Sequence, residues 1–405
     1  MQPRRILVAA TGGIAAYKVP ELVRALRRAG HEVRCVATRG AASFVSPLVL
    51  QTLTGHPVRS ELLDPSEEGE IDHIALADWA ELVVVAPATA HTLARMAQGL
   101  ADDLVCAVLL ATRAPVLVAP AMNVNMWSHP ATRSNVAVLR ERGVRFVGPA
   151  SGELACGWQG EGRMAEPAEI AAHAEWALGA RSLAGRRVVV TAGGTREPID
   201  TVRSLSNSSS GKMGFEVAAE AARRGADVVL VAAPCALATP AGVRRVDVVT
   251  ALDMHDAVHA ELADADVVVK AAAVADFRPA ARAERKLKKE VLGDAAGLTL
   301  ELVPNPDILA EVSAPGPGRE RRVVVGFAAE SEDVLPAAKR KLARKGCDLL
   351  VANDVSRADA GFDVDTNAVA FVWPSGDVEE LPLLPKRDVA AQLFDRIEKL
   401  LRSRA

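Results

Sequence analysis

The sequence predicts an α/β fold with two doubly wound domains in tandem. Its 405 residues exceed what one hydrophobic core usually holds, so more than one domain is expected. Short β-branched runs alternate with longer helical stretches, which is typical of parallel strands buried on both faces. The same alternation restarts after residue 180. We therefore expect domains at 1–180 and 181–405, joined within the stretch 177–185.

The first half begins with a strand, a glycine turn and a helix expected over residues 16–30. Its strands are expected at 4–10, 32–38, 81–87, 115–120 and 144–148. In such folds ligands bind at the carboxyl ends of strands, usually where a strand runs into a glycine turn. The turn at 11–18, TGGIAAYK, is neither GxGxxG nor a P-loop, so by itself it predicts neither NAD nor ATP.

The second half repeats this order, starting with a strand and glycine turn in 185–200 and a helix over 214–226. Further strands are expected at 227–233, 265–276, 322–330 and 348–354. Its glycine turn, TAGGTREPID, occupies the same place as the first one. By itself, a Gly-Gly turn after a strand is as consistent with close packing as with ligand binding.

Composition excludes several classes of function. A net charge of −3 and a pI near 6.3 show no general attraction to nucleic acid or anionic membranes. No stretch is long and apolar enough to span a membrane, and the N-terminal segment is a strand rather than a signal peptide. The cysteines are odd in number and form no CxxC pair, which argues against a disulfide framework or zinc site and favours the cytoplasm. They are Cys35, Cys106, Cys156, Cys235 and Cys347.

Three residues of the first half are candidates for chemistry, each with a plainer alternative. His73 precedes a helix and could simply bond to solvent or a carboxylate. Asn123 lies between apolar residues, where an amide could bind a substrate carboxylate or serve only its own loop. Cys156 lies in the glycine-rich stretch 152–164, GELACGWQGEGRM. It could be a buried filler, half of a pair, or a reactive thiol on a mobile flap.

Five motifs occur in a fixed order, at 11–18, 72–80, 87–104, 120–127 and 151–164. In this order they resemble the phosphopantothenoylcysteine decarboxylases over nearly the whole first half. The resemblance implies a flavodoxin-like domain that forms trimers with FMN between subunits. It places His73 in the active-site base region, Asn123 in the substrate-carboxylate motif and Cys156 as proton donor on a flap hinged by glycines. The positions that it implies for FMN are Gly12, Gly13, Thr38, Ala88 and Thr89.

The implied reaction suits these residue types. Flavin oxidation of the substrate thiol to a thioaldehyde gives the carbon an electron sink, so decarboxylation yields a stabilised enethiolate. An acid must then protonate that carbon in a closed site, which suits a thiol on a closing loop. One departure from the family pattern is His91, where asparagine is expected.

The second half carries motifs at 205–214, 270–280, 284–290, 303–309, 325–330, 339–346 and 351–356. Taken alone, the first motif predicts a capped helix, and the lysine-rich third motif predicts the solvated face of a helix. In order they resemble the CTP-dependent phosphopantothenate–cysteine ligases from about 186 to 400. The resemblance implies that Lys286 acts in forming an acyl-cytidylate and Asn207 in consuming it. The implied CTP positions are Asp276, Lys286, Asn305, Pro306, Asp307, Ile308, Phe327, Lys341 and Lys345.

The triphosphate carries about four negative charges, so lysines and Mg2+ are expected to neutralise it. No ligands for Mg2+ are identified from the sequence. The polar stretch 283–297 is expected to form a flap over the nucleotide.

Together the halves predict a bifunctional cytoplasmic enzyme of coenzyme A biosynthesis. Its partners would be 4′-phosphopantothenate, cysteine, CTP and 4′-phosphopantothenoylcysteine, with neither nucleic acid nor membrane. The resemblance implies trimers through the first half and dimers through the second, combining into a dodecamer. The alternatives are another flavin-dependent decarboxylase, a prenylated-flavin synthase, or an inactive regulatory relative.

Overall fold

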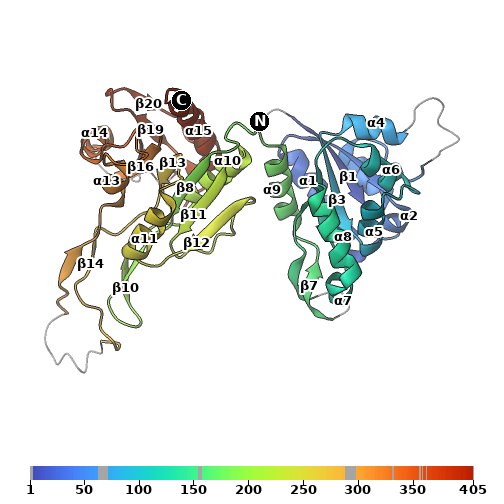
Figure 1. Cartoon of the computed structure of the whole chain (residues 1–405), viewed down its shortest axis with the longest axis horizontal. Coiled ribbons are helices and arrows are strands. Elements are labelled where there is room, and N and C mark those ends of the chain that lie inside the picture. Colours follow the sequence, from blue (N-terminus) through green and yellow to red (C-terminus); the bar gives the residue numbers. More distant parts are fainter. Residues whose placement is uncertain are drawn as a thin grey trace. The chain divides into compact units, whose positions relative to one another are not determined.

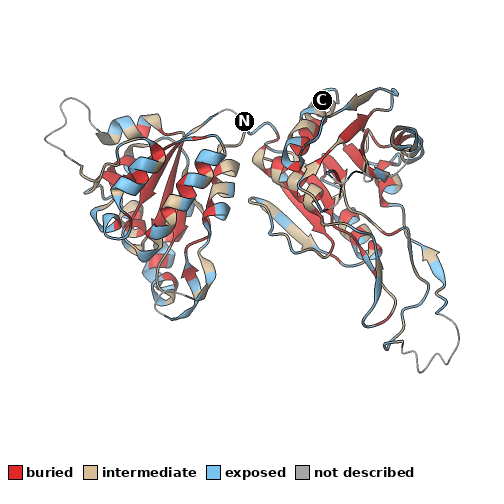
Figure 2. Ribbon diagram, turned by 180° about the vertical axis from the view of Figure 1, so that it is seen from behind, coloured by how far each residue is buried: buried red, intermediate tan, exposed pale blue. Residues whose placement is uncertain are grey.

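The computed structural model describes residues 3–62, 72–153, 157–287, 298–330, 333–354, 357, 359–361 and 363–404. The contacts of the chain divide it into two compact units, Met1–Gly179 and Ala180–Ala405. In each unit, helices pack on a twisted sheet (Figure 1). Figure 2 shows that the sheet strands are largely buried, whereas the outer sides of the helices are exposed. The predicted α/β fold with two doubly wound domains is confirmed.

Over its described residues, the first unit contains a five-stranded parallel sheet with the order β2-β1-β3-β4-β5. The strands are β1 (Arg5–Ala10), β2 (Glu32–Ala37), β3 (Leu82–Ala88), β4 (Val116–Pro120) and β5 (Arg145–Phe146). This is the flavodoxin-like order, in which the strand sequence reverses between β1 and β3. Ligands of such sheets bind outside that reversal point, at the carboxyl ends of the strands.

Helices cover both faces of this sheet. One core lies under α1 (Val19–Arg28), α3 (Pro47–Thr54) and α9 (Pro167–Leu178). The other lies under α4 (Asp72–Trp79), α5 (Ala90–Gln98), α6 (Leu104–Ala111) and α8 (Pro130–Glu141). The helix predicted over 16–30 is instead a 3-10 turn, η1 (Ile14–Lys18), followed by α1, whose first turn contains Pro20. The shorter elements are α2 (Arg39–Ala42), α7 (Val124–Ser128), β6 (Ala150–Glu153) and β7 (Gln159–Arg163).

Over its described residues, the second unit contains an eight-stranded mixed sheet with the order β12-β11-β8-β13-β16-β17-β19-β20. The strands are β8 (Arg187–Ala192), β11 (Asp227–Ala232), β12 (Val243–Asp247), β13 (Val267–Lys270), β16 (Val323–Glu330), β17 (Leu349–Asp354), β19 (Val369–Val372) and β20 (Val378–Glu380). From β12 to β17 the pairing is parallel in Rossmann order, reversing between β8 and β13. The antiparallel strands β19 and β20 extend the sheet beyond what the sequence predicted.

The remaining elements of the second unit surround this sheet. Its helices are α10 (Lys212–Arg223), α11 (Ala251–Glu261), α13 (Ile308–Ser313), α14 (Val334–Lys345) and α15 (Lys386–Arg402). Short strand pairs join β9 (Arg196–Pro198) to β10 (Ser204–Ser206), β14 (Phe277–Pro279) to β15 (Leu302–Pro304), and β18 (Thr366–Asn367) to β21 (Leu384–Pro385). Among the residues described, no helix has the length and hydrophobicity needed to cross a membrane.

Candidate functional sites

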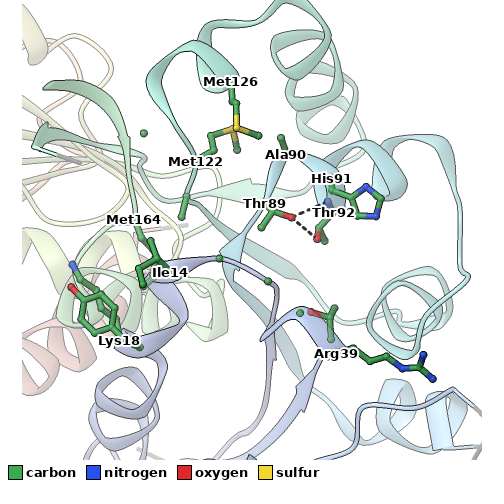
Figure 3. Close-up of a pocket in the computed structure, with 18 of the residues that line it drawn as sticks. Ile14, Lys18, Arg39, Thr89, Ala90, His91, Thr92, Met122, Met126 and Met164 are labelled. Atoms are coloured by element: carbon green, nitrogen blue, oxygen red, sulfur yellow. Dashed lines mark hydrogen bonds between the residues drawn. The ribbon is translucent and has the colours of Figure 1, made fainter. Parts of the chain in front are cut away.

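The first unit has a cavity of about 1510 Å³ outside the reversal point of its sheet. The turn after β1 and the start of α5 after β3 both line it (Figure 3). Four of the residues predicted for FMN line the cavity, namely Gly12, Gly13, Thr38 and Thr89. Ala88, also predicted, is fully buried at the end of β3 and does not line it. The sheet topology thus gathers strand ends that are about 80 residues apart in the sequence.

Threonine hydroxyls hold these loops in place. Thr11 Oγ1 donates to Pro87 O at 2.7 Å and accepts from Thr89 N at 3.2 Å, which joins the loops after β1 and β3. Thr89 Oγ1 accepts from Thr92 N at 3.2 Å and so caps α5 (Figure 3). The N-terminus of α5 therefore faces the cavity, where its backbone N–H groups suit a phosphate. His91, the departure from the family pattern, also lines the cavity there.

The cationic side chains around this cavity are paired with carboxylates. Lys18 Nζ donates to Glu166 Oε1 and Oε2 at 2.9 Å, and this contact lowers the pKa of the Glu166 carboxyl. Arg39 pairs with Glu61, and Arg95 with Asp103. Between these pairs lie apolar walls made by Ile14, Met122, Met126 and Met164. A bound molecule would thus meet apolar surface along much of its length and cations already paired with carboxylates around it.

The described residues of the glycine-rich stretch 152–164 include the end of β6 and all of β7, which pair antiparallel, and β7 lies against the loop of Asn123. A Cβ on Gly162 would lie 2.3 Å from Met122 O, and one on Gly160 would lie 3.2 Å from the Val124 methyls. These two glycines therefore allow close packing of β7 against α7. Their role as hinges stays a prediction. Trp127 Nε1 donates to Glu161 Oε2 at 3.1 Å and strengthens that contact.

The three predicted catalytic residues of the first unit are placed differently. Asn123 lines the cavity, and its Oδ1 accepts from Asn125 N at 2.8 Å as the N-cap of α7. His73 lies on α4 and does not line the cavity, and its buried Nδ1 has no hydrogen-bond partner among the described residues. Cys156 lies outside the described residues. Its predicted role as proton donor stays a prediction.

The second unit has a smaller cavity, of about 580 Å³, outside the reversal point between β8 and β13. The loop before α10, the carboxyl ends of β13 and β16, and the start of α13 line it. Nearly all residues predicted for this site line the cavity: Asn207, Asp276, Asn305, Pro306, Asp307, Ile308, Phe327, Lys341 and Lys345. Chain segments up to about 140 residues apart in the sequence therefore meet at one place.

Lysine side chains dominate the charge of this second cavity. Lys270, at the end of β13, lines it together with Lys341 and Lys345. Removal of the Lys270 ammonium group from water, followed by repulsion from Lys341, lowers its pKa to about 8. Lys345 forms an ion pair with Asp307, which also accepts from Ala310 N at 3.1 Å as the N-cap of α13. The cavity thus holds positive charge at a cost in desolvation, which an anionic ligand would offset.

Two buried amides also face this cavity without a protein partner for their oxygens. Asn353 on β17 and Asn367 on β18 line it and are 8% and 2% exposed. Neither Oδ1 has a hydrogen-bond partner among the described residues. By contrast, Asn305 is satisfied, because its Nδ2 donates to Ala275 O at 2.9 Å and its Oδ1 accepts from Arg278 Nη1 at 3.1 Å. Buried acceptors left without partners are costly, so these two indicate a place for ligand or water donors.

Lys286 is the one predicted ligase residue that does not line the cavity. It is exposed, and its neighbour Leu287 donates its N–H to Asp200 Oδ2 at 3.1 Å, near the β9–β10 hairpin. Ala283 N likewise donates to Ile199 O at 2.9 Å. Of the predicted flap 283–297, residues 288–297 lie outside the described part of the chain.

Sequence reasoning missed Lys270, Asn367 and Lys386 in this cavity. Lys270 ends a valine-rich strand, a position that could have identified it in the same way as Thr89 in the first half. Lys386 is buried, and its Nζ donates to Gly361 O at 2.8 Å and Val364 O at 2.5 Å, so it supports the cavity wall. Asn367 lies on the short strand β18 and has no local signal in the sequence.

Comparison with known proteins gives a match to each unit. A family model described as Flavoprotein matches residues 1–175, and one described as DNA/pantothenate metabolism flavoprotein C-terminal domain matches residues 183–401. A solved structure of the C-terminal domain of coenzyme A biosynthesis bifunctional protein CoaBC is 38% identical, with a TM-score of 0.46. The match covers 55% of this chain and 100% of the chain in that structure.

Several curated relatives match over nearly their full length. The coenzyme A biosynthesis bifunctional protein CoaBC of Vibrio cholerae serotype O1 (strain ATCC 39315 / El Tor Inaba N16961) is 48% identical, covering 98% of both chains. The protein of the same name from Escherichia coli (strain K12) is 48% identical, covering 97% of this chain and 96% of that one. The predicted family is confirmed: the chain belongs to the family of bifunctional coenzyme A biosynthesis proteins.

Proposed function

We propose that the two units catalyse consecutive steps of coenzyme A biosynthesis. The C-terminal unit joins 4′-phosphopantothenate to cysteine with CTP. The N-terminal unit then decarboxylates 4′-phosphopantothenoylcysteine to 4′-phosphopantetheine. The observation that carries this proposal is the presence of two cavities of contrasting chemistry, each at the reversal point of its own sheet, in a chain of this family.

The residues of the N-terminal cavity fit FMN. The start of α5 suits its phosphate, and the apolar walls suit the flavin ring. When bound, FMN supplies a two-electron oxidation of the substrate thiol, which makes loss of carbon dioxide feasible, and later returns the electrons. Asn123 binds the substrate carboxylate, and Cys156 donates the proton that replaces it.

In this proposal, His73 acts at the FMN cavity of a neighbouring subunit. Two observations support that assignment: His73 does not line the cavity of its own chain, and its buried Nδ1 has no partner among the described residues. The trimer implied by the resemblance would bring it to the FMN of a neighbour. Dimers through the second unit would then complete a dodecamer. The proposed location is the cytoplasm, supported by the unpaired cysteines Cys35, Cys106, Cys235 and Cys347 among the described residues.

In the C-terminal cavity the substrate carboxylate attacks the α-phosphate of CTP, giving an acyl-cytidylate and pyrophosphate. The cysteine amine then displaces CMP, a step in which Asn207 takes part. Lys270, Lys341 and Lys345 neutralise phosphate charge, and Mg2+ adds to this while keeping part of its water shell. Lys286 acts in the activation step. Because it lies away from the cavity, its segment 283–287 must approach the nucleotide.

The decisive experiment separates the two half-reactions in the full-length protein. We supply 4′-phosphopantothenate, cysteine, CTP and Mg2+, and measure CMP, pyrophosphate and carbon dioxide. Lys286→Gln is expected to stop CMP formation but to decarboxylate added 4′-phosphopantothenoylcysteine normally. Cys156→Ser is expected to form CMP normally but no 4′-phosphopantetheine.

Two results would contradict the assignments. A Cys156→Ser protein that decarboxylates at the normal rate would remove Cys156 from the mechanism. Protein that binds no FMN and releases no carbon dioxide would remove the proposed reaction of the first unit. Neither result would affect the family to which the chain belongs.

A further inference from the structure

Two histidines and a glutamate converge on the surface of the second unit, away from the nucleotide cavity. His255 and His259 lie four residues apart on α11 and therefore share one face of that helix. Glu311 lies on α13. His255 Nε2 and His259 Nε2 lie 2.8 Å and 3.2 Å from the same atom, Glu311 Oε2. All three residues can direct a ligand atom to one point, since those atoms lie within 4.8 Å of one another.

The backbone that carries these side chains is held by the core of the second unit. Met254 and Val258, which directly precede His255 and His259 in the sequence, are fully buried, and Val312, which follows Glu311, is 2% exposed. All three belong to one hydrophobic cluster between the helices and the sheet. The positions of α11 and α13 are therefore fixed by packing and do not depend on the surface contact. A site on such elements is preorganised.

The chemistry of the three donors selects a class of ion. Two imidazole nitrogens and one carboxylate oxygen are a donor set that Zn2+ and similar transition-metal ions accept, usually with water as a fourth ligand. Mg2+ and Ca2+ prefer oxygen donors alone. A simple ion pair would need only one histidine beside Glu311, whereas here both rings face the same oxygen with centroids 4.3 Å apart.

A further contact orients one of the rings. His255 Nδ1 lies 2.9 Å from Asp256 Oδ1. A carboxylate at Nδ1 holds the proton on that nitrogen and leaves Nε2 as the donor for a metal, which is the usual arrangement around metal-binding histidines. Asp256 thus supplies the outer contact that a built metal site requires.

We propose that His255, His259 and Glu311 bind one divalent transition-metal ion, with Zn2+ as the representative species, and that this ion joins α11 to α13. None of the three residues lines either large cavity. The helix α13 nevertheless begins at Ile308, directly after Asp307, and both of these residues line the nucleotide cavity. The ion would therefore add a second link, beside the core packing, between α11 and a helix that contributes to the nucleotide cavity. The proposed site does not depend on the proposed reactions.

The test is zinc binding to the full-length protein after treatment with a chelator, without nucleotide or Mg2+. Titration calorimetry is expected to show one equivalent of Zn2+ in the unaltered protein that is lost in the His255→Gln/His259→Gln double variant and in Glu311→Gln. Asp256→Asn is expected to weaken the binding about 10-fold. Co2+ in place of Zn2+ is expected to give the visible absorption of a four-coordinate site, again only with the three ligands present.

His56→Gln is a matched control. His56 Nε2 lies 3.5 Å from Glu32 Oε1, with a side-chain exposure of 35%, compared with 26% for His255 and 36% for His259. The substitution removes a histidine that has a glutamate beside it but is not part of a two-histidine group. Zinc binding is therefore expected to remain unchanged. Equal zinc stoichiometry and affinity in the control and the double variant would overturn the proposal.

A second measurement uses the unaltered protein and so does not depend on how the variants fold. Zn2+ is expected to protect His255 and His259 from modification by diethyl pyrocarbonate, while His56 reacts as before. Mass spectrometry measures the modification of each histidine. Equal modification of His255 and His259 with and without one equivalent of Zn2+ would also overturn the proposal.

Discussion

The two cavities share a topological origin but differ in size and charge. Both lie where parallel strands reverse their order, at β1 and β3 in the first unit and at β8 and β13 in the second. The first encloses about 1510 Å³ and the second about 580 Å³. The first pairs its cations with carboxylates, as in Lys18 with Glu166. The second brings Lys270, Lys341 and Lys345 together.

This difference indicates how one architecture serves two chemistries. Strand order determines where a ligand binds, because it brings the carboxyl ends of distant strands together. The side chains at those ends then decide which ligand binds. Apolar walls with paired cations suit a flavin ring, whereas clustered lysines suit a triphosphate. Substitutions in one cavity should therefore leave the reaction of the other unchanged.

The largest effect is expected from Lys270→Met in the second cavity. This change removes one of the cations proposed to neutralise the triphosphate, so CTP-dependent ligation is expected to fall about 100-fold or more. Decarboxylation of added 4′-phosphopantothenoylcysteine should stay within about twofold. Steady-state assays of both half-reactions measure these effects. The control is Lys339→Met, because Lys339 is exposed on α14 and does not line the cavity.

The pH dependence of CTP binding tests the same residue. The pKa of Lys270 is lowered to about 8, so its charge is present at pH 7 and is lost as the pH rises through 8. CTP affinity of the unaltered protein, measured by calorimetry, is therefore expected to fall about 10-fold from pH 7 to pH 9. The Lys270→Met protein should show no such fall. An equal fall in both proteins would assign the pH dependence to another group.

A smaller effect is expected in the first cavity from Gly162→Ala. The new methyl group would meet Met122 O at 2.3 Å and push β7 away from the loop of Asn123. Displacement of a substrate-binding residue by about 1 Å can cost up to about 100-fold, so a decarboxylation loss of about 10- to 100-fold is expected. Ligation should be unaffected.

Gly160→Ala is the graded control for this prediction. Its methyl group would meet the Val124 methyls at 3.2 Å, and the three nearest atoms are all in that side chain, which can shift. The backbone strain of a non-glycine residue is common to both variants, because φ is 145° at Gly160 and 155° at Gly162. The loss of decarboxylation in Gly160→Ala should therefore be clearly smaller than that in Gly162→Ala. Equal rates in both variants and in the unaltered protein would show that the hairpin contact does not position Asn123.

Much of this arrangement could be predicted from the sequence, because it depends on local patterns. Valine-rich runs predict buried parallel strands. Topology brings the polar residues that follow them to the carboxyl edge of their own sheet, as with Thr38 in the first unit and Asp276 in the second. The close packing of Gly162 could not be predicted in this way. A glycine-rich stretch indicates unusual backbone requirements but not what lies against it.

Tertiary contacts account for the other differences. Lys286 was predicted at the nucleotide, yet the hydrogen bond of Leu287 to buried Asp200 holds its segment beside another hairpin. Asn367 was not predicted, because it reaches the cavity from the short strand β18, whose position depends on its pairing with β21 at Leu384–Pro385. Such positions follow from long-range packing, which no local pattern in the sequence encodes.

The smallest effect is expected from Asn353→Leu. This variant separates the effect of the Asn353 amide on the stability of the free protein from its effect on CTP binding. The buried Oδ1 of Asn353 has no partner among the described residues, so an apolar replacement should leave the melting temperature without ligand unchanged or higher. CTP binding should weaken only about 5-fold, since one neutral hydrogen bond is lost. Thermal denaturation with and without CTP measures both effects.

Asn305→Leu, which removes a satisfied amide of the same cavity, should instead lower the melting temperature of the free protein. A similar destabilisation by Asn353→Leu would mean that its amide already has a structural partner, and that it is not held ready for a ligand.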